Sequence, residues 1–176
     1  PMFSQVKELP HGDNVYWGLD FGFSIDVTAL VKSIIVNDSL YSQELIYERG
    51  LTNQDIADKM VELDIRKHYD EIIADSAEPK SIEEIYQRGF NIRPCAKGSG
   101  SVEYGHQKVR QFKQFWTEDS VNCIKEQRNF RYLADKDGKL TDKTTHIWSH
   151  GMDARRYIVT EFKGPRIGHG PRSYRF

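Results

Sequence analysis

VYWGLDFG, residues 15–22, is the stretch that decides the fold. Its large apolar residues Trp17 and Leu19 alternate with smaller or polar ones, and Asp20 falls on the opposite side from them. Alternation with a period of two is typical of a β-strand with one face buried. The sequence therefore predicts a half-buried strand that ends close to a carboxylate.

The segments that follow first repeat this strand pattern and then change to a helical one. We expect two more strands at 27–36 and 40–48, joined by a tight turn, in an antiparallel meander. Helical spacing and capping signals then alternate with short apolar runs. The expected segments are a helix within 51–68 capped by Thr52, a strand at 71–76, a helix from Pro79 to Gly89, a strand at 91–95, a loop at 97–101, a helix carrying Val109, Phe112 and Phe115, a strand at 121–124, a hairpin at Asp137-Gly138 and a helix from Gly151 to Phe162.

This order of elements predicts an α/β fold with a mixed central sheet covered by helices. We expect one domain at 15–163, preceded by a linker at 1–14 and followed by a basic, flexible tail at 164–176. The first residues lack the apolar core of a signal peptide, and no apolar run reaches membrane-spanning length. Two cysteines without metal-type spacing are typical of buried thiols in a reduced, intracellular protein.

The net charge of −1 does not by itself indicate a nucleic-acid-binding protein. Two stretches, 108–113 and 163–176, carry basic residues and no acidic ones. A charge run is usually only a solvated face, so neither stretch identifies a ligand without further evidence.

Ligand-binding and active sites of open α/β sheets lie at the carboxyl ends of the strands, and this sequence has carboxylates at two such positions. Asp20 lies toward the end of the first strand, and Asp75 ends the strand at 71–76. If these strands are parallel neighbours, the two carboxylates repel each other unless a hard dication lies between them. The last helix adds His150 and Asp153, which share a helix face. The pattern predicts a cluster of three carboxylates with a histidine.

Ordinary structural roles remain open for each of these residues. An aspartate after a strand is more often a turn former or a helix cap. Asp153 would also suit the dipole at the start of a helix, and Glu78 would be a simple first-turn acid. Asp26 and Asp119 are expected to be turn residues.

Four motifs, in this order, resemble one known family: WGLDFGF, IIADSAEPKSI, KGSGSVEYGHQKVRQF and HGMDARRY. They resemble the C-terminal nuclease domain of the large terminase subunit of tailed bacteriophages, and the similarity runs from Tyr16 to Phe162. The resemblance implies a ribonuclease-H-like fold with an extra hairpin before the last helix. It also implies metal-dependent endonuclease activity that cuts concatemeric viral DNA during genome packaging, with little sequence specificity, in the cytoplasm of the infected host.

The resemblance assigns roles by motif. Asp20, Asp75 and Asp153 match carboxylates that hold two divalent ions, Mg²⁺ or Mn²⁺, for phosphodiester hydrolysis that leaves 3′-hydroxyl and 5′-phosphate ends. His150 matches a histidine that binds metal or phosphate or relays a proton, and Glu78 is a lesser ligand candidate. The candidates for contact with DNA are Lys97 and Ser101 in the loop facing the cut strand, and Lys108, Arg110, Lys113, Arg128 and Arg131 for phosphates.

The motor part of such a terminase is missing from the sequence. The chain has no GxxxxGK[ST] phosphate loop, so we expect a nuclease domain separated from its ATPase. The expected partners are double-stranded DNA and, in the full protein, the terminase ATPase domain, the small terminase subunit and the portal or procapsid. No membrane partner is expected.

Three alternatives remain open at this point. In the first alternative, the chain would be a non-catalytic module that docks on portal and procapsid. In the second, it would be another ribonuclease-H-like enzyme, such as a resolvase or transposase. DFGFS (20–24) also fits the phosphate-holding D-x-G-x-S loop of actin-like and sugar-kinase folds, but the chain is short for that fold and shows no second copy.

Overall fold

The computed structural model describes residues 3–130, 132–144 and 146–164 of the chain. No helix within these residues is long and apolar enough to cross a membrane. The strands are β1 (Ser4–Val6), β2 (Asn14–Asp20), β3 (Val27–Val36), β4 (Ser39–Arg49), β5 (Ile72–Ala74), β6 (Ile92–Pro94), β7 (Lys113–Thr117), β8 (Tyr132–Ala134) and β9 (Leu140–Thr144). The helices are α1 (Asn53–Glu62), α2 (Pro79–Gln87), α3 (Ser101–Arg110), α4 (Val121–Asn129) and α5 (His150–Glu161), with a 3₁₀ turn η1 (His146–Trp148) before α5.

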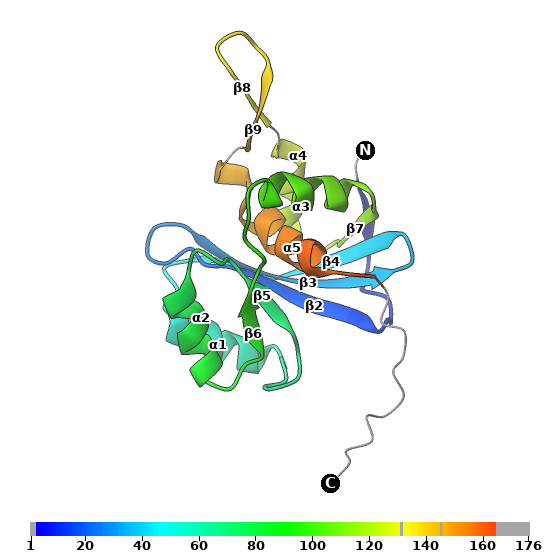
Figure 1. The fold of residues 1–176 in the computed structure, drawn as a ribbon. Coiled ribbons are helices and arrows are strands. Elements are labelled where there is room, and N and C mark those ends of the chain that lie inside the picture. Colours follow the sequence, from blue (N-terminus) through cyan, green and yellow to red (C-terminus); the bar gives the residue numbers. More distant parts are fainter. Residues whose placement is uncertain (1–2, 131, 145, 165–176) are drawn as a thin grey trace.

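Seven of the strands form one mixed sheet in the order β1-β7-β4-β3-β2-β5-β6. β2, β3 and β4 pair in antiparallel fashion, which confirms the predicted meander. β5 and β6 extend it on the β2 side and β7 and β1 on the β4 side, all in parallel. The predicted α/β fold with a mixed sheet is confirmed (Figure 1).

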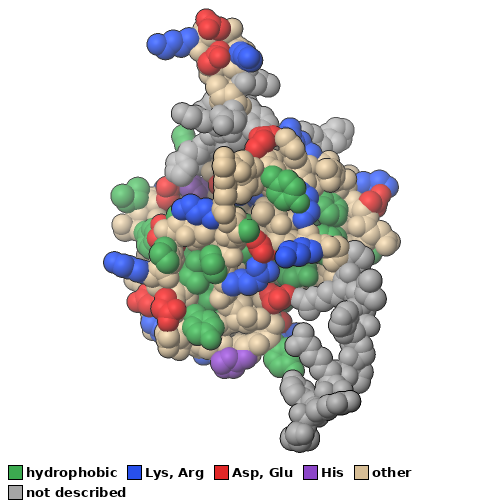
Figure 2. Space-filling view, viewed as in Figure 1, with side chains coloured by type: hydrophobic (Ala, Val, Ile, Leu, Met, Phe, Trp, Pro, Cys, Tyr) green, Lys and Arg blue, Asp and Glu red, His purple; other side chains and the backbone are tan. Residues whose placement is uncertain are grey.

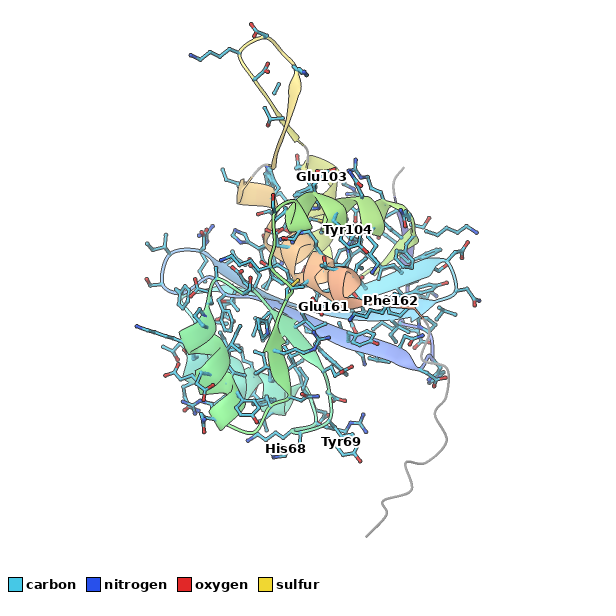
Figure 3. The ribbon with its side chains drawn as sticks, viewed as in Figure 1. His68, Tyr69, Glu103, Tyr104, Glu161 and Phe162 are labelled. Carbon is cyan, nitrogen blue, oxygen red and sulfur yellow. The ribbon has the colours of Figure 1, made fainter. Side chains whose placement is uncertain are left out.

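Helices cover both faces of this sheet, and they divide into two groups (Figure 1). α1 and α2 pack on one face, where Met60 and Ile85 join a cluster with Trp17 and Leu19. α3, α4 and α5 cover the other face, and α3 lies across α5 (Figures 1 and 3). The prediction of a half-buried β2 was therefore wrong, because both of its faces are covered and its last five residues are all buried.

The predicted third helix is shorter than its apolar spacing indicated. α3 ends at Arg110, and Phe115 lies instead in β7, stacked on Tyr41 with ring centroids 4.5 Å apart. Phe112 lies between the two elements and packs against the α5 side of the core. The three apolar residues spaced three apart therefore belong to a helix end, a turn and a strand. Burial in β7 follows a period of two from Lys113 to Trp116, and Trp116 is fully buried.

The stretch at 121–124 was predicted to be a strand and is instead the start of α4. The N-cap residue of α4 makes no side-chain capping hydrogen bond. A capping carboxylate comes from β4 instead, because Glu44 accepts from the Cys123 amide and from the Asn122 side chain, each at 2.7 Å. No local sequence signal marks a helix whose cap is supplied from another part of the chain.

The structure tests the predicted linker and hairpin but describes almost none of the predicted tail. Residues 4–6, predicted to be linker, form β1 and pair with β7. The hairpin at Asp137-Gly138 is confirmed, since β8 and β9 pair around it and Gly138 has a φ of 79°. This hairpin projects from the body beside α4 and η1 (Figure 1). The predicted tail lies almost wholly outside the described residues.

A very close approach between β2 and α5 occurs at Gly18. A Cβ atom on Gly18 would lie 1.8 Å from the Ala154 carbonyl oxygen, which is far inside van der Waals contact. Only glycine therefore allows α5 to lie directly on the central strand. This contact sets the distance between Asp20 at the end of β2 and the polar residues of α5.

We expect Gly18→Ala to lower the free energy of unfolding by about 3 kcal/mol, because the new methyl group forces α5 off β2. Urea unfolding followed by circular dichroism measures the change. Gly98→Ala is the matched control, since a Cβ there meets nothing within 4 Å, and it should change stability by no more than about 0.5 kcal/mol. Equal stabilities for the two variants would contradict the close contact.

Candidate active site

Two carboxylates lie side by side at the carboxyl ends of β2 and β5. These strands are parallel, and Leu19 pairs with Ala74, so Asp20 and Asp75 are the next residues on adjacent strands. The predicted neighbourhood of the two aspartates is confirmed. Asp20 is buried, whereas Asp75 is half-buried.

α5 brings three polar side chains to Asp20. His150 Nδ1 lies 3.2 Å from Asp20 Oδ2, and the Tyr157 hydroxyl donates to Asp20 Oδ1 at 3.0 Å. Asp153 lies close enough for its charge to raise the pKa of Asp20. Asp153 itself accepts from the Arg156 Nε and Nη2 atoms at 3.2 and 3.1 Å. Positions 150, 153 and 157 share one face of the helix, which explains why they converge.

Asp20 and Asp153 place negative charge in a buried region of the protein, where the ionised form of a carboxylate is poorly solvated. Burial raises the pKa of Asp20 to about 6, and the charge of Asp153 adds to the rise. Burial also raises the pKa of Asp153, in spite of its hydrogen bonds to Arg156. The hydrogen bond to Asp20 raises the pKa of His150. A buried carboxylate with a raised pKa favours either a proton or a cation.

The second strand end carries a smaller acidic group. Asp75 Oδ1 accepts from the Ala77 amide at 2.9 Å, which shapes the turn between β5 and α2. Burial and the charge of Asp75 both raise the pKa of Glu78, so Glu78 lies close to this group. Asp75 thus has the turn role considered from the sequence and also lies beside Asp20.

Three residues of this region were given no site role by sequence reasoning. Asp26, expected to be a turn residue, lies in the turn after β2 and also faces His150, with 3.5 Å between Oδ1 and Nε2. Tyr157 had a signal that was not used, since it follows Asp153 by four residues on the same helix face. Glu126 contacts the first turn of α5 from α4, just after the stretch at 121–124 that was predicted to be a strand.

Part of the predicted DNA-contact set lies at the same edge of the sheet. The Cys95 amide bonds to the Ala74 carbonyl, so the loop after β6 begins beside the end of β5. Lys97 is exposed in this loop, and Ser101 begins α3 directly after it. Arg128 is exposed in the last turn of α4, before the projecting hairpin.

Other predicted DNA contacts are engaged or lie elsewhere. Lys108 donates to the carbonyl group at the end of α5, and Arg110 pairs with a glutamate of its own helix at 3.3 Å. Lys113 lies at the opposite end of the sheet from Asp20, 3.0 Å from Asp38. Arg131 falls outside the described residues. On the face in Figure 2, acidic and basic side chains are interspersed, so no single-sign patch guides DNA across it.

The donor set fits a hard divalent cation, although the cluster is not a ready-made metal site. Within the described residues, no group of three or more His, Cys, Asp or Glu side chains is arranged to hold a metal ion. In this structure both oxygens of Asp20 make hydrogen bonds, to His150 and Tyr157, and Asp153 accepts from Arg156. Carboxylate oxygens are nevertheless the ligands that Mg²⁺ and Mn²⁺ prefer, and the raised pKa values indicate uncompensated charge.

Comparison with known proteins identifies relatives over most of the chain. A family described as "Terminase RNAseH like domain" matches residues 20–161. The PBSX phage terminase large subunit of Bacillus subtilis (strain 168) is 31% identical over 149 residues, and the large terminase subunit of Bacillus phage SPP1 is 30% identical over 159 residues. These matches cover 83% and 85% of this chain but only 34% and 36% of the relatives, so the chain spans about a third of their length.

Solved structures share the fold. The large terminase nuclease domain of bacteriophage SPP1 with bound Mn aligns with a TM-score of 0.74 and 27% identity, over 83% of this chain and 85% of that one. The large terminase of a thermophilic bacteriophage aligns with a TM-score of 0.72 and 18% identity, over 90% of this chain and 41% of that one. At such low identity the second match supports the fold alone.

We expect Asp20→Asn to stabilise the ion-free protein at neutral pH, because it removes a buried charge. With a pKa raised from 3.8 to about 6, Asp20 keeps its proton longer in the folded chain than in the unfolded chain. The gain should therefore be close to zero below pH 4, grow between pH 4 and 6, and reach up to about 3 kcal/mol above pH 6. Urea unfolding in EDTA at pH 4.5 and 8 measures it, and a variant less stable than wild type at pH 8 would contradict the electrostatic account.

Proposed function

This chain belongs to the family of terminase RNase H-like domains, and we propose that it is a metal-dependent endonuclease that cuts concatemeric phage DNA during genome packaging. The observation that carries the proposal is the meeting of Asp20 and Asp75 on adjacent parallel strands with Asp153 of α5 beside Asp20. Three buried or half-buried carboxylates from distant segments are thus gathered in one region of the molecule. They suit a task that needs concentrated negative charge.

We assign the metal-holding role to Asp20, Asp75 and Asp153, with two Mg²⁺ or Mn²⁺ ions as the cofactor. The SPP1 relative whose nuclease domain was solved with bound Mn supports a divalent ion. Such ions would supply a water molecule of lowered pKa and neutralise charge on the phosphodiester. Glu78 lies close to Asp75 and remains a lesser ligand candidate.

The residues around the carboxylates hold and orient them. Tyr157 donates to Asp20 Oδ1 from a buried position and fixes the rotation of that carboxylate. Arg156 does the same for Asp153 and neutralises part of its charge. His150 lies between Asp20 and Asp26, with one ring nitrogen near each carboxylate, and this position suits the relay of a proton.

Double-stranded DNA is the proposed substrate. Lys97 and Ser101, at the sheet edge that carries Asp75, and Arg128 on α4 are the positions best placed to contact the backbone. Phosphate contacts position DNA without reading its sequence, which suits cutting with little specificity. We further propose that this chain is part of a longer protein that also contains an ATPase domain. That protein would act in the host cytoplasm together with a small terminase subunit and a portal or procapsid.

We expect Asp75→Ala and Asp153→Asn each to lower the rate of Mn²⁺-dependent plasmid nicking about a thousandfold, because each removes a carboxylate that would hold the ions, and the ions would stabilise charge on the reacting phosphate. Glu62→Gln, at the exposed end of α1, removes the same charge elsewhere and should leave the rate unchanged. Gel quantification of nicked plasmid in Mn²⁺, Mg²⁺ and EDTA provides the measurement. Full activity in Asp153→Asn would contradict the assigned cluster, and inactivity of folded wild type would favour the docking alternative.

A binding test independent of cutting uses thermal stability. At Mn²⁺ concentrations a hundred times the dissociation constant, an ion that binds only the folded chain stabilises it by about 2.7 kcal/mol. We expect Mn²⁺ to raise the melting temperature of wild type and of Glu62→Gln but not of Asp20→Asn, as followed by calorimetry. Equal stabilisation of all three proteins would place the ion away from Asp20.

A further inference from the structure

We propose that Glu126 of α4 is a positioning residue for the candidate active site, and that its carboxylate fixes the first turn of α5 so that His150 and Asp153 face Asp20. The inference rests on the proposed metal site and goes beyond it, because Glu126 contacts neither metal nor DNA in that proposal. Its side chain is 1% exposed and lies beneath the start of α5.

The contacts of Glu126 are unusually complete for one carboxylate. Oε2 accepts from the Gly151 amide at 2.7 Å and from the Met152 amide at 3.1 Å. Oε1 accepts from the His150 amide at 3.1 Å and from the Tyr47 hydroxyl at 2.7 Å. Three consecutive amides of the first turn thus share one acceptor group, while Tyr47 holds that group from the sheet side.

The N-cap of α5 does not supply a side-chain acceptor for these amides. The N-cap residue, Ser149, makes no side-chain capping hydrogen bond. The first amides of a helix have no partner within the helix, and the positive end of the helix dipole lies there. A buried carboxylate at this point both satisfies the amides and opposes the dipole, so removing it leaves buried donors unpaired.

The packing indicates that this arrangement is specific. A Cβ on Gly151 would lie 2.4 Å from Cys123 Sγ and 3.1 Å from Glu126 Oε2. Glycine at 151 therefore lets the start of α5 sit directly on α4. Together with the contact at Gly18, this fixes both the height and the rotation of α5 over the sheet.

Rotation of the first turn matters because two candidate site residues belong to it. His150 gives its backbone amide to Glu126 while its ring contacts Asp20. Asp153 lies three residues further along the first turn, on the same face of the helix. Groups that orient metal ligands in this way typically change metal affinity 10- to 100-fold when they are lost. Glu126 is thus expected to act on the site through α5.

The chain offers a matched control in Glu44. Its carboxylate caps α4 much as that of Glu126 caps α5, accepting from the Cys123 amide at 2.7 Å. Glu44→Gln and Glu126→Gln therefore make the same chemical change at two successive helix starts. Only the second change touches the helix that carries His150 and Asp153.

The experiment compares wild type, Glu126→Gln, Glu126→Asp and Glu44→Gln. Amide hydrogen exchange measures the Gly151 and Met152 amides, NMR of the His150 ring nitrogens reports its contact with Asp20, and calorimetry gives the Mn²⁺ dissociation constant. In Glu126→Gln we expect exchange about tenfold faster at both amides, altered His150 ring shifts, and Mn²⁺ affinity about tenfold weaker or more. Glu126→Asp keeps the charge and should give an intermediate effect. It is the variant to use if Glu126→Gln does not fold.

The control, Glu44→Gln, should speed exchange at the Cys123 amide and leave Mn²⁺ affinity unchanged.

Two results would overturn the inference. Unchanged exchange at Gly151 and Met152 would show that the carboxylate does not hold the turn, and faster exchange with wild-type Mn²⁺ affinity and His150 shifts would reduce Glu126 to a structural cap. A wild-type protein that binds no Mn²⁺ would instead refute the proposed metal site. The exchange rates and His150 shifts would then still decide the positioning role.

Discussion

The missing side chain at Gly18 is the constraint on which the site depends. With no Cβ between them, β2 and α5 meet backbone to backbone, and a methyl group there would lie 1.8 Å from the Ala154 carbonyl oxygen. Helix positions on either side of Ala154 are thereby brought to the end of the strand, where Asp20 lies. The same strand pairs in parallel with β5, which adds Asp75 from the other side. One central strand thus organises carboxylates from three distant segments.

The fold keeps these carboxylates together against their mutual repulsion. Burial raises the pKa values of Asp20 and Asp153, so in the absence of a cation their ionised forms work against stability. Hydrogen bonds from Tyr157, His150 and Arg156 offset part of that effect. Charge that packing maintains in this way is what the proposed metal site requires, in line with the trade-off between stability and function seen at active sites.

The sequence predicted the features that depend on local pattern. The first strand, the meander and the hairpin at Asp137-Gly138 carry period-two or turn signals, and the structure has all three, although both faces of the first strand are covered. The neighbourhood of Asp20 and Asp75 followed from strand ends alone. α4 was missed because its capping carboxylate, Glu44, comes from β4, 79 residues before Cys123. Glu126 was missed for the same reason, since its role exists only once α4 and α5 are packed.

The most direct test of the central claim is anomalous diffraction from crystals of the protein grown with Mn²⁺. The account predicts anomalous peaks bounded by the carboxylates of Asp20, Asp75 and Asp153, with the side chains of Asp20 and Asp153 turned from their protein donors toward the ions. Peaks confined to surface carboxylates elsewhere, with this cluster keeping its hydrogen bonds to His150, Tyr157 and Arg156, would contradict it.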